Sequence, residues 1–344
     1  MNKQFILLGI LITGLVHTGN AQIKTLLYKN RADKKFTKEA YVDASRLYKK
    51  ILDAGDTTQH ALARLAESYY KLNDYNKARP YYSELFNRGR VDSASYYLHY
   101  AEVLRAGKHY TKARKWLDKF KEMNPGANIS QVFSSQEFVK ALKNDSGRYE
   151  ITRLNINTPA SDFGPAFYGD SIVFSSAREL DNKILSQKYN WNEEPFLNLY
   201  MSGWKGGPSV GKPSLLAQSL VTKYHEGPVD FVQGDTVLYF TRNNYLKLGR
   251  EEGRVNRLKI YQAVWNGEKW VEQEELSING DKFSTGHPTL TQDGQTMYFS
   301  SDRPGGFGGP DIYRSQLTRD GWSEPENLGA KINTAGKEMF PFIH

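Results

Sequence analysis

Residues 75–82 read Tyr75-Asn-Lys-Ala-Arg-Pro-Tyr-Tyr82, and this stretch decides the fold of the first half of the chain. The same Tyr-x-x-Ala-x-x-x-Tyr pattern occupies residues 41–48 and, with leucine in the last place, residues 110–117. The central alanines lie 34 and 35 residues apart, at Ala44, Ala78 and Ala113. Helical apolar spacing that recurs at such a period is typical of stacked supersecondary units. The sequence therefore predicts an array of antiparallel helix pairs.

The residues upstream of the later alanines extend this pattern. Leu65-Ala66 precedes Ala78, and Tyr100-Ala101 precedes Ala113. The pattern resembles the tetratricopeptide repeat, in which small residues let two antiparallel helices approach closely and an aromatic side chain fills the gap. We expect three repeats that cover about residues 25–125, with Asn73 and Gly107 at the turns between helices. A capping helix is expected at Ser134–Lys143, after the helix-ending Pro125.

The second half repeats a different unit. Residues 164–176, 227–241 and 287–301 each carry a strand, a tight Gly-Asp or Asp-Gly turn and a second strand rich in β-branched or aromatic residues. A third strand follows each hairpin, at 197–201, 258–262 and 311–314. The turn before the fourth strand carries a tryptophan, which is Trp204, Trp270 or Trp322. Four strands per repeated unit are typical of a β-propeller blade, so the predicted fold is a helical array followed by a β-propeller.

A short segment marks the start of a further blade. Ile156-Asn157-Thr158 precedes Pro165 and reappears as Ile332-Asn333-Thr334 before Pro341, at identical spacing. We therefore predict that a fourth blade begins at residues 338–342. Because propellers close with roughly four to eight blades, we expect the natural chain to continue beyond His344.

Composition separates the two halves. The 344 residues carry a net charge of +8, but residues 22–150 hold 25 basic and 15 acidic groups, whereas residues 151–344 hold 20 and 23. With 39 % hydrophobic and 24 % charged residues, wholesale disorder is excluded. The absence of cysteine excludes a disulfide scaffold, a cysteine-ligated metal, a thiol nucleophile and a lipidated N-terminal cysteine.

The first residues predict export. Lys3 is followed by an apolar run over residues 5–16 and by the small residues Gly19-Asn20-Ala21, as in a cleaved signal peptide. The alternative, a membrane anchor, needs roughly 20 apolar residues, and this run is shorter. We predict a signal peptide at residues 1–21, helical repeats at 22–145 and a partial propeller at 146–344. Export makes a nucleic-acid partner improbable despite the positive charge.

One stretch of the third blade carries a more specific resemblance. Residues 298–313, Tyr-Phe-Ser-Ser-Asp-Arg-Pro-Gly-Gly-Phe-Gly-Gly-Pro-Asp-Ile-Tyr, and residues 322–329 resemble the TolB-type propeller repeat. Together with the helical repeats and the leader, the chain is similar to the PorE-like, OmpA-family envelope proteins of Bacteroidota. Residues 175–178 and 241–244 of blades one and two lack the Gly-rich run.

The resemblance implies a scaffold in the periplasm, associated with the outer membrane and with type IX secretion or gliding. The implied partners are envelope proteins, among them a PorP/SprF-type outer-membrane barrel or type IX secretion components. It also implies peptidoglycan binding through an OmpA-like domain expected beyond His344.

Two sets of residues are candidate partner-binding groups. Basic side chains of the helical half could line a groove for an acidic peptide: Arg64, Lys71, Arg79, Arg105, Lys112, Arg114 and Lys115. The alternative is an ordinary solvated helix face. In blade three, Asp302, Arg303 and Asp311 flank the Gly-rich run and could bind a small ligand or cation. The alternative there is an ion pair that fixes the loop.

No catalytic constellation is visible in the sequence. The histidines show no His-Glu-x-x-His spacing, and there is no Gly-x-Ser-x-Gly elbow. The Gly-rich run of residues 304–309 lacks the Gly-Lys-Ser/Thr ending of a phosphate loop. We therefore predict a non-enzymatic scaffold without cofactor or metal. The alternatives are a propeller that gates a peptidase domain and a glycan-binding propeller.

Overall fold

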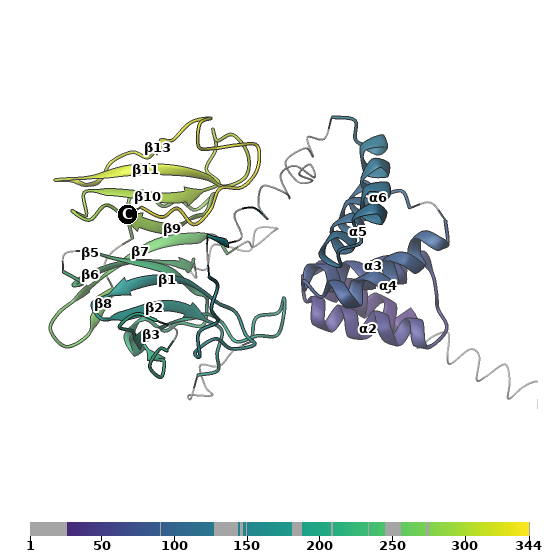
Figure 1. The fold of residues 1–344 in the computed structure, drawn as a ribbon, viewed down its shortest axis with the longest axis horizontal. Helices are drawn as coiled ribbons and strands as arrows, with labels where there is room; N and C mark the ends of the chain where they lie inside the picture. Colours follow the sequence, from purple (N-terminus) through teal and green to yellow (C-terminus); the bar gives the residue numbers. More distant parts are fainter. Residues whose placement is uncertain are drawn as a thin grey trace, which may run out of the picture. The chain divides into compact units, whose positions relative to one another are not determined.

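The computed structural model describes two compact units (Figure 1). The helical unit comprises residues up to Tyr149 together with Tyr189–Glu193, and the sheet unit comprises Glu150–Lys188 and Glu194–His344. The described residues are 26–126, 144, 147–148, 150–180, 188–244 and 256–343, apart from 90, 208, 233, 273 and 274. The predicted leader and the predicted capping helix at Ser134–Lys143 lie outside them. No helix within these ranges is long and apolar enough to cross a membrane.

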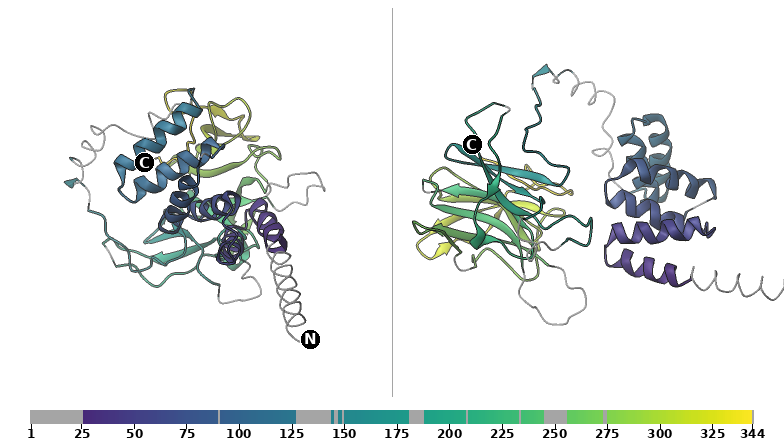
Figure 2. Two further views of the ribbon diagram at one scale, coloured as in Figure 1. Left: turned by 90° about the vertical axis from the view of Figure 1, so that its right-hand side faces the viewer. Right: turned by 90° about the horizontal axis from the view of Figure 1, so that it is seen from below.

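The helical unit is an array of antiparallel helix pairs of the tetratricopeptide type, as predicted. A helix over residues 26–37 pairs with the first of five further helices, which are α2 (Tyr41–Asp53), α3 (Gln59–Lys71), α4 (Tyr75–Asn87), α5 (Ala94–Ala106) and α6 (Tyr110–Met123). Neighbours in sequence pack side by side (Figure 2).

The repeated alanines lie where these helices touch. Ala44, Ala78 and Ala113 are at most 2 % exposed, and in each repeat a second buried alanine lies twelve residues earlier on the partner helix, at Ala32, Ala66 and Ala101. A methyl side chain on both helices lets the backbones approach closely, and the aromatic rings of Tyr48 and Tyr82 fill the adjacent space.

Asn73 and Gly107 lie in the turns between paired helices, as expected. One residue in each turn has a positive φ: Glu39, Asn73 and Lys108, at 58°, 57° and 61°. Gly107 has a φ of −80° instead. A Cβ at Gly107 would lie 3.1 Å from the His109 ring and 3.3 Å from the Arg79 guanidinium. A side chain at this position would therefore require the His109 ring and the Arg79 guanidinium to move slightly.

The segment Tyr189–Glu193 completes the helical unit. The Trp191 ring packs edge-on against Tyr41 at 4.8 Å, and its Nε1 donates a hydrogen bond to the Lys71 carbonyl at 3.1 Å. Glu193 accepts two hydrogen bonds from Arg46, at 2.6 and 2.8 Å. These contacts cover Tyr41, which is 5 % exposed.

The sheet unit is propeller-like, with three antiparallel sheets of at least four strands. Blade one contains β1 (Asp162–Tyr168), β2 (Ser171–Ser176), β3 (Asn198–Gly203) and β4 (Ser214–Leu215). Blade two contains β5 (Glu226–Val232), β6 (Val237–Asn243), β7 (Leu258–Trp265) and β8 (Trp270–Glu272). Blade three contains β9 (Thr285–Leu290), β10 (Thr296–Ser301), β11 (Asp311–Thr318), β12 (Gly321–Trp322) and β13 (Glu326–Asn327). The first strands β1, β5 and β9 lie beside one another in that order.

Apolar cores form between successive blades. One core joins Val173 of blade one to Phe240 and Trp270 of blade two, and another joins Tyr239 of blade two to Trp322 of blade three. The strand expected at residues 338–342 is not formed. The backbone there is tied to blade three instead, since Glu338 donates its N–H to the Pro310 carbonyl at 2.7 Å.

Candidate functional site

Three of the predicted cationic residues of the helical unit contact side chains within it. The Arg64 guanidinium lies 4.3 Å from the centre of the Phe36 ring. Lys71 pairs with Glu67 at 3.8 Å. Arg79 Nη1 lies 2.9 Å from His109 Nε2. These residues thus support helix packing as well as surface charge.

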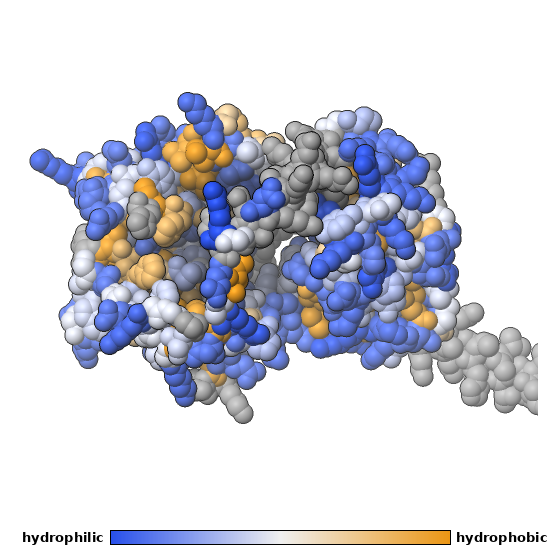
Figure 3. Space-filling model, in the orientation of Figure 1, coloured by the Kyte–Doolittle hydropathy of each residue, from blue (hydrophilic) through white to orange (hydrophobic). Residues whose placement is uncertain are grey.

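The cations of α6 have a different environment. Lys112, Arg114 and Lys115 are exposed within one turn of this helix, and Lys115 lies 5.7 Å from the Trp116 ring. Arg105, near the end of α5, is half-buried. Figure 3 shows that hydrophilic side chains cover most of the visible face of the helical unit. The structure therefore brings three of the seven predicted cations together on one exposed helix.

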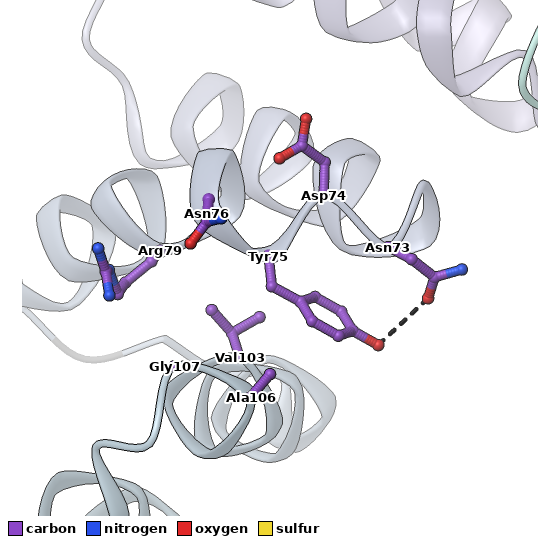
Figure 4. Close-up of a pocket in the computed structure, with 8 residues that line it drawn as sticks. All are labelled: Asn73, Asp74, Tyr75, Asn76, Arg79, Val103, Ala106 and Gly107. Atoms are coloured by element: carbon purple, nitrogen blue, oxygen red, sulfur yellow. Dashed lines mark hydrogen bonds between the residues drawn. The ribbon is translucent and has the colours of Figure 1, made fainter. Parts of the chain in front are cut away.

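A pocket of about 200 Å³ lies between the start of α4 and the end of α5 (Figure 4). Its lining residues are Asn73, Asp74, Tyr75, Asn76, Arg79, Val103, Ala106 and Gly107. Sequence reasoning identified Arg79 but not the pocket. The walls of the pocket come from α4 and α5, and the sequence of neither helix shows that the two pack against each other.

Carboxylates that pair with the repeated tyrosines are a feature that the repeat pattern did not reveal. Asp33 accepts a hydrogen bond from Tyr48 at 2.5 Å, and Glu67 accepts one from Tyr82 at 2.8 Å. Acid and tyrosine are fifteen residues apart in both repeats. In the third repeat Leu117 occupies the tyrosine position, and Glu102 accepts a hydrogen bond from Tyr70 of the preceding repeat instead. The sequence does carry a signal for these pairs, because an acid lies fifteen residues before Tyr48 and before Tyr82.

Histidines complete these pairs. His60 contacts Asp33 at 2.7 Å and His99 contacts Glu67 at 2.9 Å. Burial opposes ionisation of Glu67, but the hydrogen bonds from His99 and Tyr82 outweigh it and hold the pKa of Glu67 below its usual value. Burial raises the pKa of Tyr82 well above its usual value, so the phenol keeps its proton and donates. These acids are therefore satisfied internally.

Each blade places an arginine over a pair of aromatic rings. The pairs are Phe174 with Tyr200 under Arg178, Phe240 with Tyr261 under Arg242, and Phe299 with Tyr313 under Arg303, at 4.7–5.5 Å. Each guanidinium also donates to a main-chain carbonyl at 2.7–3.1 Å, of Ile156, Leu220 and Ile278 respectively. We call these three residues the arginine caps.

Two of the arginine caps have carboxylate partners on the first strand of their blade. Arg178 pairs with Asp162 at 3.0 Å, and Arg242 lies 3.4 Å from Glu226. Arg242 also pairs with Glu272 at 2.5 Å. In blade three Thr285 takes the position of Asp162, since Asp162 is opposite Ser176 and Thr285 is opposite Ser301.

The repeated Ile-Asn-Thr segment has a structural explanation. Thr158 donates its N–H and hydroxyl to Asp162, at 2.7 and 2.9 Å. Thr222 binds Glu226 and Thr334 binds Glu338 in the same way. The threonine thus orients a carboxylate four residues later.

Of the three candidate residues of blade three, Asp311 holds the Gly-rich turn, whereas Asp302 and Arg303 bind residues outside it. Asp311 accepts hydrogen bonds from the Phe307 N–H at 2.7 Å and from Asn327 at 2.8 Å, while its Oδ1 is buried without a partner. Asp302 accepts one from the Ser284 N–H at 2.6 Å. Arg303 donates to the Ser301 hydroxyl and the Ile278 carbonyl, and among the described residues it forms no ion pair with either acid.

Two histidines of the sheet unit are affected by burial alone. Burial lowers the pKa of His225 and of His287 to about 4, so both imidazoles are neutral at pH 7. In the part of the chain that the structure describes, no three His, Asp or Glu side chains are grouped to hold a metal ion.

No protein-family model and no curated protein matches the chain. Among solved structures, the first TPR domain of Spaghetti (RPAP3) bound to an HSP90 peptide is 19 % identical, with 35 % of this chain and 93 % of that chain covered and a TM-score of 0.29. The yeast Sti1 TPR2B domain complex is 17 % identical over 37 % and 98 %, with a TM-score of 0.26. An α-L-arabinofuranosidase from Lactobacillus brevis is 11 % identical over 52 % and 57 %, with a TM-score of 0.32. The repeats described above, rather than these scores, define the two units.

Proposed function

We propose that the protein is a non-enzymatic scaffold of the cell envelope that binds protein partners through both units. The observation that carries the proposal is the helical array itself, whose last described helix, α6, exposes Lys112, Arg114 and Lys115. Stacked helix pairs provide extended surfaces for protein partners. Residues 22–150 hold 25 basic and 15 acidic groups, so the field around the array is positive. The partner of the helical unit is accordingly an acidic segment of another protein.

The more specific proposal concerns the cell compartment. The leader-like residues 1–21 support export, and the TolB-like residues 298–313 support a place beside the outer membrane. We infer that the protein serves type IX secretion or gliding, with a PorP/SprF-type barrel or a type IX component as a partner.

The test is affinity capture of the tagged full chain from its own envelope, followed by mass spectrometry and fractionation. The proposal expects outer-membrane barrels or type IX components in the eluate and the protein in the envelope fraction. Residence in the cytoplasm, or hydrolytic activity of the pure protein with no envelope protein captured, would contradict it.

A further inference from the structure

A short segment of the chain lies on the first repeat of the helical unit and indicates what the pocket between α4 and α5 binds. We infer that this pocket receives a tryptophan side chain from the acidic segment of the protein partner, as the first repeat receives Trp191. The inference rests on the proposed function and names the partner side chain that the second repeat recognises.

Trp191 makes two contacts with the first repeat. It belongs to the segment Tyr189–Glu193, which follows β2 and precedes β3 in the sequence but is part of the helical unit. Its ring packs against Tyr41, the first residue of α2, at 4.8 Å between ring centres. Its Nε1 donates to the carbonyl of Lys71, the last residue of α3, at 3.1 Å. Because the last carbonyls of a helix have no partner within the helix, the indole N–H satisfies one of them here.

The pocket lies at the equivalent place of the second repeat. Tyr75 begins α4 as Tyr41 begins α2. Ala106 ends α5 as Lys71 ends α3. Tyr75 and Ala106 both line the pocket (Figure 4). The two features that hold Trp191, a tyrosine at the start of one helix and a carbonyl at the end of the next, therefore recur around the pocket.

The equivalent tyrosines also have equivalent aromatic neighbours. The ring of Tyr41 packs against Phe36 at 5.3 Å between ring centres. The ring of Tyr75 packs against Tyr70 at 5.9 Å. Phe36 and Tyr70 are 34 residues apart, as the two tyrosines at the helix starts are. What differs is the cover, because Tyr41 is 5 % exposed beneath Trp191, whereas Tyr75 is half-buried beside an open pocket.

Smaller side chains leave room for an indole in the second repeat. Ala106 takes the place of Lys71. Gly107 takes the place of Leu72, the residue after the end of α3. The pocket has a volume of about 200 Å³, which admits one aromatic side chain. Among the described residues the Ala106 carbonyl accepts no hydrogen bond, so it can accept one from an indole N–H.

The rest of the lining suits a tryptophan within an extended segment. Tyr75 and Val103 provide apolar surface for the indole ring. Asn73 and Asn76 make the pocket polar near the start of α4. Their side-chain amides both donate and accept, so they can pair with the N–H and C=O groups of the partner's main chain.

The segment on the first repeat also has the charge that the proposed function requires. Residues 189–194 read Tyr-Asn-Trp-Asn-Glu-Glu, with two acidic residues and no basic one. Glu193 accepts two hydrogen bonds from Arg46. Because Pro80 takes the place of Arg46 in the second repeat, the tryptophan rather than the acid is the group that both sites bind.

The test uses amide-resolved NMR of the full chain with a peptide of residues 188–195 as the probe, at constant ionic strength. We expect saturable shifts of the Asn76, Ala106 and Gly107 signals, and none with the Trp191→Ala peptide. Shifts confined to the first repeat, where the peptide competes with the chain's own segment, would overturn the inference. Equal shifts with the two peptides would overturn it as well.

Two variants that add the same side chain test where the peptide binds. Ala106→Phe fills the pocket with a ring and should weaken binding at least about tenfold. Ala54→Phe, at an exposed alanine just after the end of α2, is the control and should leave binding unchanged. Equal weakening by both variants would overturn the inference. If the pocket fails these tests while envelope partners are still captured, the site assignment falls and the scaffold function stands.

Discussion

The two units stabilise their buried carboxylates in different ways. In the helical unit, Glu67 is satisfied by the neutral phenol of Tyr82 and by His99, whereas in the sheet unit Glu226 lies against the buried Arg242. Glu67 also lies 3.8 Å from the half-buried Lys71 but has no buried arginine beside it, whereas the arginine beside Glu226 is 1 % exposed. Under the proposed function, cations of the helical unit serve partner binding, whereas Arg242 serves stability. Residues 22–150 carry a net charge of +10 and residues 151–344 a net charge of −3.

The largest expected effect concerns the arginine cap of blade two. Arg242→Met should lower the free energy of unfolding of the sheet unit by about 3–5 kcal/mol, because Glu226 and Glu272 lose their partner and one of them is buried. Urea unfolding followed by tryptophan fluorescence measures this loss. The double variant Arg242→Met/Glu226→Gln should recover part of it, and no recovery would show that the ion pair is not the cause.

The next effect is the pH dependence of the sheet unit. Burial raises the pKa of Glu226 from 4.5 to about 7, so the folded unit binds a proton that the unfolded chain has released above pH 4.5. Stability should fall as pH rises from 4.5 to 7, by up to about 1.4 kcal/mol per pH unit. Glu226→Gln should flatten this slope in thermal unfolding, and an unchanged slope would contradict the assignment.

A smaller effect is expected in the helical unit. Tyr82→Phe removes the donor to Glu67 and should cost about 1–3 kcal/mol in chemical unfolding, because the acid is buried. Tyr48→Phe should cost less, since Asp33 is more exposed to water. Tyr110→Phe, at a side chain that is 61 % exposed, is the control and should be neutral. A larger loss for Tyr48 than for Tyr82 would contradict this order.

The smallest expected effect is on acid stability. Because hydrogen bonds hold the pKa of Glu67 below 4.5, its contribution is present above pH 4.5 and is lost as pH falls through the folded pKa. Glu67→Gln should therefore reduce the acid sensitivity of the helical unit below pH 4.5. Circular dichroism at 222 nm during acid titration measures the change, and an unaltered acid transition would contradict it.

Local patterns predicted the repeats of both units because each repeat carries its own spacing. The strands Ser171–Ser176 and Thr296–Ser301 and the buried alanines were readable from the sequence. The arginine caps were not. Arg178 and Arg303 follow their phenylalanine by four residues, but Arg242 follows Phe240 by two and reaches the same ring pair from another position of the backbone. Because the arginine side chain is long, it can reach the ring pair from different sequence positions. The distance in sequence from the phenylalanine therefore does not reveal that the arginine caps repeat.

The candidate site was only partly predictable for a related reason. The sequence identified the cations of the helical unit, but it could not show that Arg64 stacks on Phe36 while Lys112 and Arg114 stay exposed. Whether a cation is packed or exposed depends on which neighbouring helix covers its side of the helix, and the sequence does not show this. The strand expected at residues 338–342 is not formed. An inner blade strand needs a neighbouring strand to complete its backbone hydrogen bonds.

The most direct test of the central claim is quantitative envelope capture with matched charge reversals. One variant carries Lys112→Glu, Arg114→Glu and Lys115→Glu, and the control carries Lys205→Glu, Lys212→Glu and Arg319→Glu, which change equally many exposed cations of the sheet unit. The account predicts that the helical variant loses a specific acidic envelope partner that the wild type and the control retain. Equal retention of every captured protein by both variants would contradict it.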